Sequence, residues 1–190
     1  MSQLLINHIK KTIDVSEKEM ECIMTFFVSE TFKKKDFIIR ENDKVAHIYF
    51  ILSGLVQLAV TDRDANEHII SFAAADWWET DYQAFYTQTR ATQSLKCIEK
   101  TDVLKLSYEG YHQMQKEVPA MTHFFLHKAV NGHISNQRRI FSLITLSAKG
   151  KYEHFLKHYP LLLQRIPKTT LALYLGVSRE TLSRFFSESK

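Results

Sequence analysis

The hydrophobic and polar positions of the chain repeat with two different periods. The N-terminal part has a helical period, in which Ser16 and Glu19 have the spacing of a capping box and predict that a helix begins after Ser16. The buried stripe of this helix is expected at Met20, Ile23, Met24 and Phe27.

A series of short strands is predicted next. Apolar runs are separated by turn residues such as Asn42-Asp43, Ser53-Gly54 and Asp62 to Asn66. The segments that read as strands are Phe37–Ile39, His47–Leu52, Leu55–Thr61, His68–Ala73 and Ser94–Leu106. Short antiparallel strands in close succession predict a small sandwich or β-roll.

The helical period returns at Tyr108, and a long helix is predicted from Pro119 to about Ser147, with a tolerated Gly132. About 28 residues at 1.5 Å per residue give a helix of about 42 Å. Positions spaced alternately by four and three residues form a coiled-coil seam, namely Leu126, Val130, His133, Gln137, Ile140 and Ile144. This seam predicts pairing with a second copy of the helix, and packing on the chain's own β-domain is the alternative.

After a separate helical patch at Tyr152–Tyr159, two short helical patterns are joined by Gly176-Val177. In the first, Lys168–Leu175, one apolar face is formed by Leu171, Ala172 and Leu175. Gly176 can take the left-handed conformation that ends a helix. Ser178 is expected to cap the second helix by accepting a hydrogen bond from the amide of Thr181, while Val177 and Leu182 face the core.

The second of these helices presents polar side chains on its outer face, namely Arg179, Glu180, Ser183 and Arg184. These residue types can reach base edges or phosphates from a helix in the major groove. A helical hairpin with an ordinary solvated face would show the same pattern.

Charge distribution favours the DNA-binding interpretation. Residues 1–135 contain 15 Lys and Arg against 18 Asp and Glu, whereas residues 136–190 contain 10 against 3, a net charge of +7. A basic C-terminal module gains affinity for DNA by displacing counterions from phosphates. An ordinary basic surface is the alternative.

With 190 residues, of which 45% are hydrophobic, the chain can form one substantial core and a smaller one. No apolar stretch approaches the length of a membrane span and no signal-peptide order is present, so we expect a cytoplasmic protein without a membrane partner. Cys22 and Cys97 have no partners at ligand spacing, which argues against a disulfide framework or an iron–sulfur cluster.

The run Ile-Pro-Lys-Thr-Thr-Leu-Ala-Leu-Tyr-Leu-Gly-Val-Ser-Arg-Glu-Thr, which ends at Thr181, resembles the helix-turn-helix of the CRP/FNR family of bacterial transcription regulators. The resemblance continues from about Phe32 to the end of the chain, in the order β-roll, long dimer helix and helix-turn-helix. It implies double-stranded DNA and RNA polymerase as partners of a homodimer. By this resemblance the base-reading positions are Arg179, Glu180 and Arg184, and the phosphate-contacting positions are Lys168, Thr169, Ser178 and Thr181.

The segment that matches the family's cyclic nucleotide cassette departs from the family pattern. Thr80-Asp81 stands where the family has Gly-Glu, whose Glu binds the ribose, and Ala91-Thr92 stands where an Arg-Ser or Arg-Thr pair binds the cyclic phosphate. Arg90 lies one residue early, and a slip of one residue on a strand turns a side chain to the other face. The candidate effector residues are Asp81, Arg90 and Thr92, with Asn136 and Gln137 where the family's dimer helix meets the base.

Aromatic residues crowd the same segment, namely Trp77, Trp78, Tyr82, Phe85 and Tyr86. They either fill the pocket or accept a flat apolar ligand. We therefore expect a degenerate pocket that does not respond to cAMP and no resident cofactor, while an unknown small effector stays open.

Histidines lie four residues apart at His123 and His127 and again at His154 and His158. Neither pair has further ligands that would complete a metal site, so none is predicted. The sequence contains no nucleophile motif, phosphate-binding glycine loop or paired catalytic carboxylates, so we expect no enzyme activity.

These patterns predict an α+β chain with an N-terminal antiparallel β-roll, a double-stranded β-helix of the cyclic-nucleotide-binding kind, over residues 1–118. A long dimerisation helix over 119–147 and a helix-turn-helix DNA-binding domain over 148–190 follow. The predicted function is that of a CRP/FNR-type transcription regulator, a homodimer that reads an inverted-repeat operator. The alternative is a stand-alone ligand-binding β-roll module with a helical protein-interaction tail.

Overall fold

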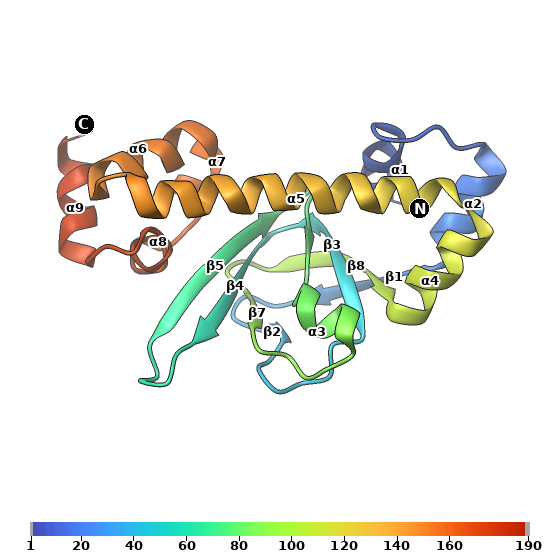
Figure 1. Ribbon diagram of the computed structural model, residues 1–190, viewed down its shortest axis with the longest axis horizontal. Helices are drawn as coiled ribbons and strands as arrows, with labels where there is room; N and C mark the ends of the chain where they lie inside the picture. Colours follow the sequence, from blue (N-terminus) through green and yellow to red (C-terminus); the bar gives the residue numbers. More distant parts are fainter. Residues whose placement is uncertain (1, 189–190) are drawn as a thin grey trace. The chain divides into compact units, whose positions relative to one another are not determined.

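The structure is a computed structural model that describes residues 2–188, and it divides into two compact units (Figure 1). The first unit comprises the described residues up to Val60 together with residues 71–129. The second comprises residues 61–70 and the described residues from Val130 onward. The division therefore falls within the long helix, and the three functional domains drawn from the sequence stay a prediction.

Two four-stranded sheets form the predicted β-roll (Figure 1). One has the strand order β1-β8-β3-β6 and the other β2-β7-β4-β5. The strands are β1 Phe27–Phe32, β2 Phe37–Ile39, β3 His47–Ser53, β4 Leu55–Thr61, β5 Glu67–Ala74, β6 Trp78–Glu79, β7 Ser94–Cys97 and β8 Thr101–Ser107. The pairings of β1 and β3 with β8, and of β2 and β4 with β7, are antiparallel.

Two sequence-based assignments in this region are wrong. Phe27 does not continue the first predicted helix, because it begins β1 and pairs with Leu106 of β8. The single run Ser94–Leu106 is two strands, broken where the amides of Ile98 and Glu99 both turn to the carbonyl of Leu55. Gly54 makes this crossing possible, because a Cβ there would overlap the carbonyl of Lys100.

Four helices accompany the strands of the first unit. They are α1 Gln3–Lys10, α2 Glu17–Thr25, α3 Tyr82–Thr87 and α4 Tyr108–Glu117. The capping box predicted at Ser16 and Glu19 is present at the start of α2. The sequence did not predict α1 or α3.

Helix α1 is held against the roll by His8. The His8 Nδ1 lies 2.7 Å from a carboxylate oxygen of Asp76, and the Trp78 indole N–H donates to His8 Nε2 over 3.3 Å. Because Nε2 accepts, Nδ1 carries the proton and donates to Asp76. Burial, and then the positive charge of Lys128, lower the pKa of His8 below 6.5.

The long helix α5 spans Ala120–Thr145, as predicted within two residues at each end. Its first turns bury Met121, Phe124 and Phe125 in the first unit. Farther along, Val130 is 49% exposed and Ile144 is 77% exposed. The apolar residues of the predicted seam therefore remain exposed in the single chain.

The second unit contains four further helices, α6 Ala148–His158, α7 Pro160–Leu163, α8 Lys168–Leu175 and α9 Arg179–Glu188. Helix α6 begins four residues before the predicted patch, because the Ser147 hydroxyl caps it by accepting from the amide of Gly150. The core of these helices consists of Tyr152, Phe155, Leu162, Ile166, Leu171, Ala172, Leu175 and Leu182. Among the described helices, none is long and apolar enough to cross a membrane.

Candidate nucleic-acid interface and effector site

The turn between α8 and α9 is built as the sequence predicts. Gly176 has a left-handed conformation with φ of 64°, and its amide and that of Val177 close the end of α8. The Ser178 hydroxyl accepts a hydrogen bond from the amide of Thr181 over 3.1 Å and so caps α9. Leu182 is fully buried, which fixes the inner face of α9.

The outer face of α9 is open to solvent. Arg179, Glu180, Ser183 and Arg184 are all exposed, and a shallow open depression is lined by Glu180, Ser183, Arg184 and Ser187. Hydrogen bonds from its own backbone amide and from Ser178 keep the pKa of Glu180 below its usual range, so it is an acceptor at neutral pH. The α9 face therefore offers two cationic donors and one anionic acceptor.

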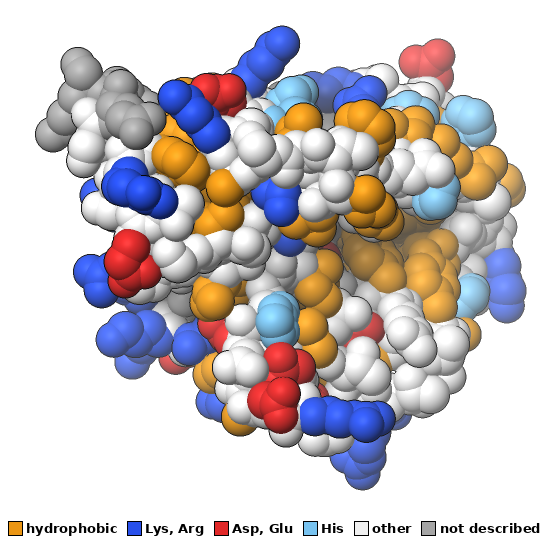
Figure 2. Space-filling view, turned by 60° about the vertical axis from the view of Figure 1, so that its left-hand side comes forward, with side chains coloured by type: hydrophobic (Ala, Val, Ile, Leu, Met, Phe, Trp, Pro, Cys, Tyr) orange, Lys and Arg blue, Asp and Glu red, His pale blue; other side chains and the backbone are white. Residues whose placement is uncertain are grey.

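The candidate phosphate-contacting residues flank that face. Lys168 and Thr169 are exposed at the start of α8, and the Lys168 ammonium lies 4.5 Å from the centroid of the Phe186 ring. The hydroxyl of Ser178 is already engaged in the cap, and Thr181 is half-buried. Lys and Arg side chains are also exposed around the C-terminal helices, at the left of Figure 2.

The cassette carboxylate, Asp81, is fully buried and has a structural role. Its Oδ1 accepts from the amide of Ala84 and caps α3. Its Oδ2 accepts from the amides of Thr92 and Gln93 over 2.9 and 3.2 Å, and from the hydroxyl of Thr92 over 3.2 Å. With four donors on two oxygens, this carboxylate has little capacity left for a ribose hydroxyl.

The other effector candidates are divided between the two units. Arg90 is exposed, and its guanidinium donates to the carbonyl of Asn42 over 2.8 Å, on the loop before β3. Ala91 is only 2% exposed, so no cation stands at the phosphate-pairing position. Asn136 and Gln137 are exposed on the part of α5 that belongs to the second unit. Of the three candidates in the first unit, the structure brings together Asp81 and Thr92, while Arg90 bonds to Asn42.

The crowded aromatic residues have separate roles. Trp78 packs against Phe50 and Phe125 on the helical side of its sheet. Phe85 is fully buried, whereas Tyr82 and Tyr86 are about half exposed, with their rings stacked 6.5 Å apart.

A buried carboxyl on β6, Glu79, was not among the predicted site residues. Its Oε2 accepts from the Ser71 hydroxyl over 2.6 Å and its Oε1 from the amide of Thr80 over 3.1 Å. Burial raises the pKa of Glu79 to about 7, against these two hydrogen bonds, which lower it. Successive side chains of a strand point to opposite faces, so the neighbouring Trp78, packed on one face, is the sequence signal that could have placed Glu79 on the other.

Within residues 2–188, no group of three or more His, Cys, Asp or Glu side chains is placed to hold a metal ion. His154 and His158 lie with their rings 4.1 Å apart, and His158 Nδ1 bonds the carbonyl of His154.

Comparison with known proteins supports this reading of the fold. Residues 29–117 match the family model of the cyclic nucleotide-binding domain. No curated protein matches the chain significantly in sequence.

Solved structures of regulators are similar over most of the chain. The c-di-GMP responsive global regulator CLP of Xanthomonas campestris is 16% identical, with a TM-score of 0.73 over 92% of this chain and 91% of its own. FixK2 of Bradyrhizobium japonicum is 14% identical, with a TM-score of 0.74 over 85% of this chain and 83% of its own. A CooA mutant of Carboxydothermus hydrogenoformans is 16% identical, with a TM-score of 0.67 over 95% and 82%.

At these identities the solved structures establish the fold, while the family model identifies the roll itself. Residues 29–117 therefore match the cyclic nucleotide-binding domain, and the chain has the fold of the solved CRP/FNR-type regulators that its sequence resembles.

Proposed function

We propose that the protein is a DNA-binding transcription regulator of the CRP/FNR type and acts by binding rather than catalysis. The observation that carries this proposal is the outer face of α9, where Arg179, Glu180 and Arg184 are exposed on a capped helix. Arginine reads guanine edges and a carboxylate accepts from cytosine, so this set suits direct readout in the major groove.

The reading unit in this proposal is a homodimer paired through α5. The exposed apolar residues along the helix supply a surface that a second copy can cover. Two-fold symmetry then places two recognition helices on half-sites about one turn of DNA apart, so the operator is an inverted repeat. RNA polymerase is the further partner that the resemblance implies.

The sensor pocket in this proposal is degenerate and does not respond to cAMP. Support comes from the saturated carboxylate of Asp81, from Ala91 at the phosphate-pairing position, and from Arg90 bonded to the Asn42 carbonyl. A bound cyclic phosphate would lose its hydrating water without gaining the two parallel hydrogen bonds of an arginine guanidinium.

Selection of duplex DNA from a random pool, followed by binding measured at increasing salt, tests the proposal. A regulator selects an inverted repeat, and its affinity falls steeply with salt as phosphate contacts release counterions. A protein that selects no DNA but captures a small ligand would instead be the stand-alone β-roll module with a protein-interaction tail.

A further inference from the structure

Arg139 on α5 bonds two residues of the second unit, one on β5 and one on α8, through a single nitrogen atom. Its Nη2 donates to the carbonyl oxygen of Ile69 on β5 over 2.8 Å and to that of Tyr174 on α8 over 3.1 Å. Its guanidinium carbon lies 3.5 Å from the centroid of the Tyr174 ring. One side chain therefore ties together α5, β5 and α8.

Both acceptors lie at the margin of a secondary-structure element. Tyr174 is in the last turn of α8, and the turn amides of Val177 and Gly176 go to Ala172 and Leu173 instead. Strand β5 is at the end of its sheet, where one row of carbonyls has no strand partner. A guanidinium satisfies both carbonyls and complements the negative end of the helix dipole.

The contact between Arg139 and Tyr174 lies beside the turn that leads into α9. Tyr174 precedes the left-handed Gly176 by two residues. Its ring is in contact with Arg139 and also packs edge-to-face on Phe155 of α6, with centroids 5.5 Å apart. The end of α8, and with it the direction in which α9 leaves, is thus held by neighbours outside the helix-turn-helix.

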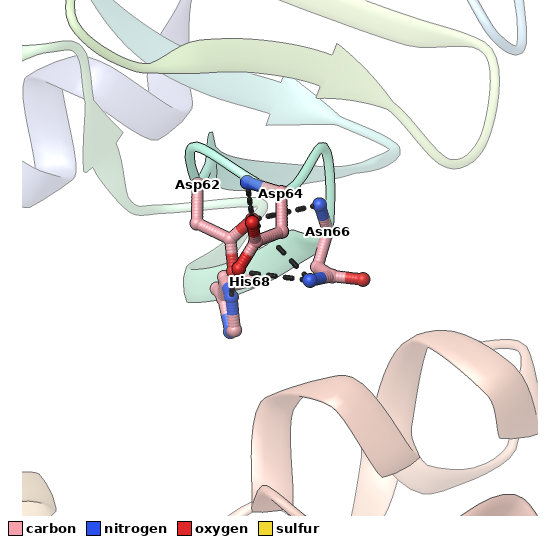
Figure 3. Close-up of polar contacts among 4 residues, drawn as sticks. All are labelled: Asp62, Asp64, Asn66 and His68. Carbon is pink, nitrogen blue, oxygen red and sulfur yellow. Dashed lines mark hydrogen bonds and ion pairs between the residues drawn. The ribbon is translucent and has the colours of Figure 1, made fainter.

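The hairpin that carries Ile69 is itself ordered at its turn (Figure 3). The Asp62 carboxylate accepts from the amides of Asp64 and Asn66 over 2.9 Å and lies 2.7 Å from His68 Nε2. These hydrogen bonds lower the pKa of Asp62 to about 2, so it stays charged at physiological pH. These hydrogen bonds fix the conformation of the turn that leads to Ile69.

We propose that Arg139 is a positioning residue that couples the β4–β5 hairpin to the recognition helix α9. It does so by holding the C-terminal end of α8 against β5. The consequence for DNA affinity rests on the proposed function, whereas the consequence for local order does not.

Hydrogen exchange of the full-length protein tests the coupling without DNA. In Arg139→Ala, amides of residues 69–71 and 174–178 should exchange about tenfold faster, since hydrogen bonds to a charged donor are lost at both ends. Arg139→Lys should be intermediate, because an ammonium lacks the planar fork and the stack. Arg138→Ala, which removes the same charge from the exposed neighbour, is the matched control and should leave both segments unchanged.

DNA binding is the second measurement. On a site selected by the wild type, Arg139→Ala should bind about tenfold more weakly than Arg138→Ala, a difference comparable to one lost charge-assisted hydrogen bond. Arg179→Ala should lose DNA binding with no change in exchange at residues 69–71. If the wild type selects no DNA, the proposed function is refuted, and the coupling is then decided by the hydrogen exchange result alone.

Equal exchange rates in Arg139→Ala and Arg138→Ala would overturn the coupling. If Arg139→Ala does not fold, as judged by circular dichroism, the decision passes to Arg139→Lys and to Tyr174→Leu, which removes the stacked ring and keeps the carbonyl. Both should speed exchange at residues 174–178, and wild-type rates in both would also reject the proposal.

Discussion

The carboxylate of Asp81 accepts hydrogen bonds from both the amide and the hydroxyl of Thr92, over 2.9 and 3.2 Å. In a nucleotide-binding cassette these two positions would face the ligand. Here the Asp81 carboxylate and the Thr92 hydroxyl bond each other.

Asp81→Ala should destabilise the protein even without any ligand. The substitution leaves buried amide donors without an acceptor, which should cost about 3 kcal/mol in the free energy of unfolding. Urea unfolding followed by circular dichroism measures this loss, and Asp64→Ala in the exposed hairpin should change stability by no more than about 0.5 kcal/mol. An Asp81→Ala variant as stable as the wild type would show that the Asp81 carboxylate is not needed for folding, and Asp81 would again be a candidate for ligand binding.

cAMP should bind weakly or not at all, and DNA binding should not require it. The phosphate finds Ala91 where an arginine would pair with it, and the loss of such a bidentate contact should weaken affinity by about 3 kcal/mol or more. Calorimetric titration with cAMP, cGMP and c-di-GMP is the measurement. Micromolar affinity for cAMP would show that Arg90 leaves the Asn42 carbonyl and reaches the phosphate.

Arg179→Ala and Arg184→Ala should each abolish specific DNA binding while the fold stays intact. Both side chains project from the exposed face of α9, and each lost base contact should cost about 1–3 kcal/mol. Gel shifts on the selected palindrome decide the point, with the exposed Lys157→Ala on α6 as the charge-matched control. Unchanged affinity in both arginine variants would show that α9 does not bind in the major groove.

Val130→Glu should convert a dimer to a monomer. The substitution places two like charges in an apolar interface, where desolvation is costly. Sedimentation measures the change, and Ser135→Glu, on another side of α5, should leave the dimer intact. A folded, dimeric Val130→Glu variant would mean that the dimer forms elsewhere.

Glu79 should make stability depend on pH. Its pKa is raised to about 7 in the folded state from 4.5, so the folded protein binds more protons than the unfolded one between these values. Its contribution to stability is therefore present below pH 4.5 and is lost as the pH rises toward 7 and beyond.

Glu79→Gln keeps one acceptor oxygen for the amide of Thr80, its NH2 group can donate to the Ser71 hydroxyl, and it cannot ionise. The difference in unfolding free energy, wild type minus Glu79→Gln, should fall as the pH rises from 4.5 to 8. Because both proteins contain His8, whose effect on stability has the opposite pH dependence, its contribution cancels in this difference. Glu21→Gln on the surface of α2 is the control. A difference that does not vary with pH would show that Glu79 titrates normally.

Sequence alone predicted the features that arise from residues within one or two turns of each other. Ser16 with Glu19, Ser178 with Thr181, and Gly176 at the end of α8 are local devices whose partners lie three or four residues away. The long helix and most strand segments followed from periodicity for the same reason. The exposed face of α9 is therefore a property of the sequence.

Tertiary structure decided what depends on partners far along the chain. Phe27 became a strand residue because it pairs with Leu106, Arg90 turned to the carbonyl of Asn42, and Arg139 bonded Ile69 and Tyr174. Periodicity carries no information on such pairs, because side-chain type fixes what a residue can bond but not which distant backbone group the fold brings within hydrogen-bonding distance of it.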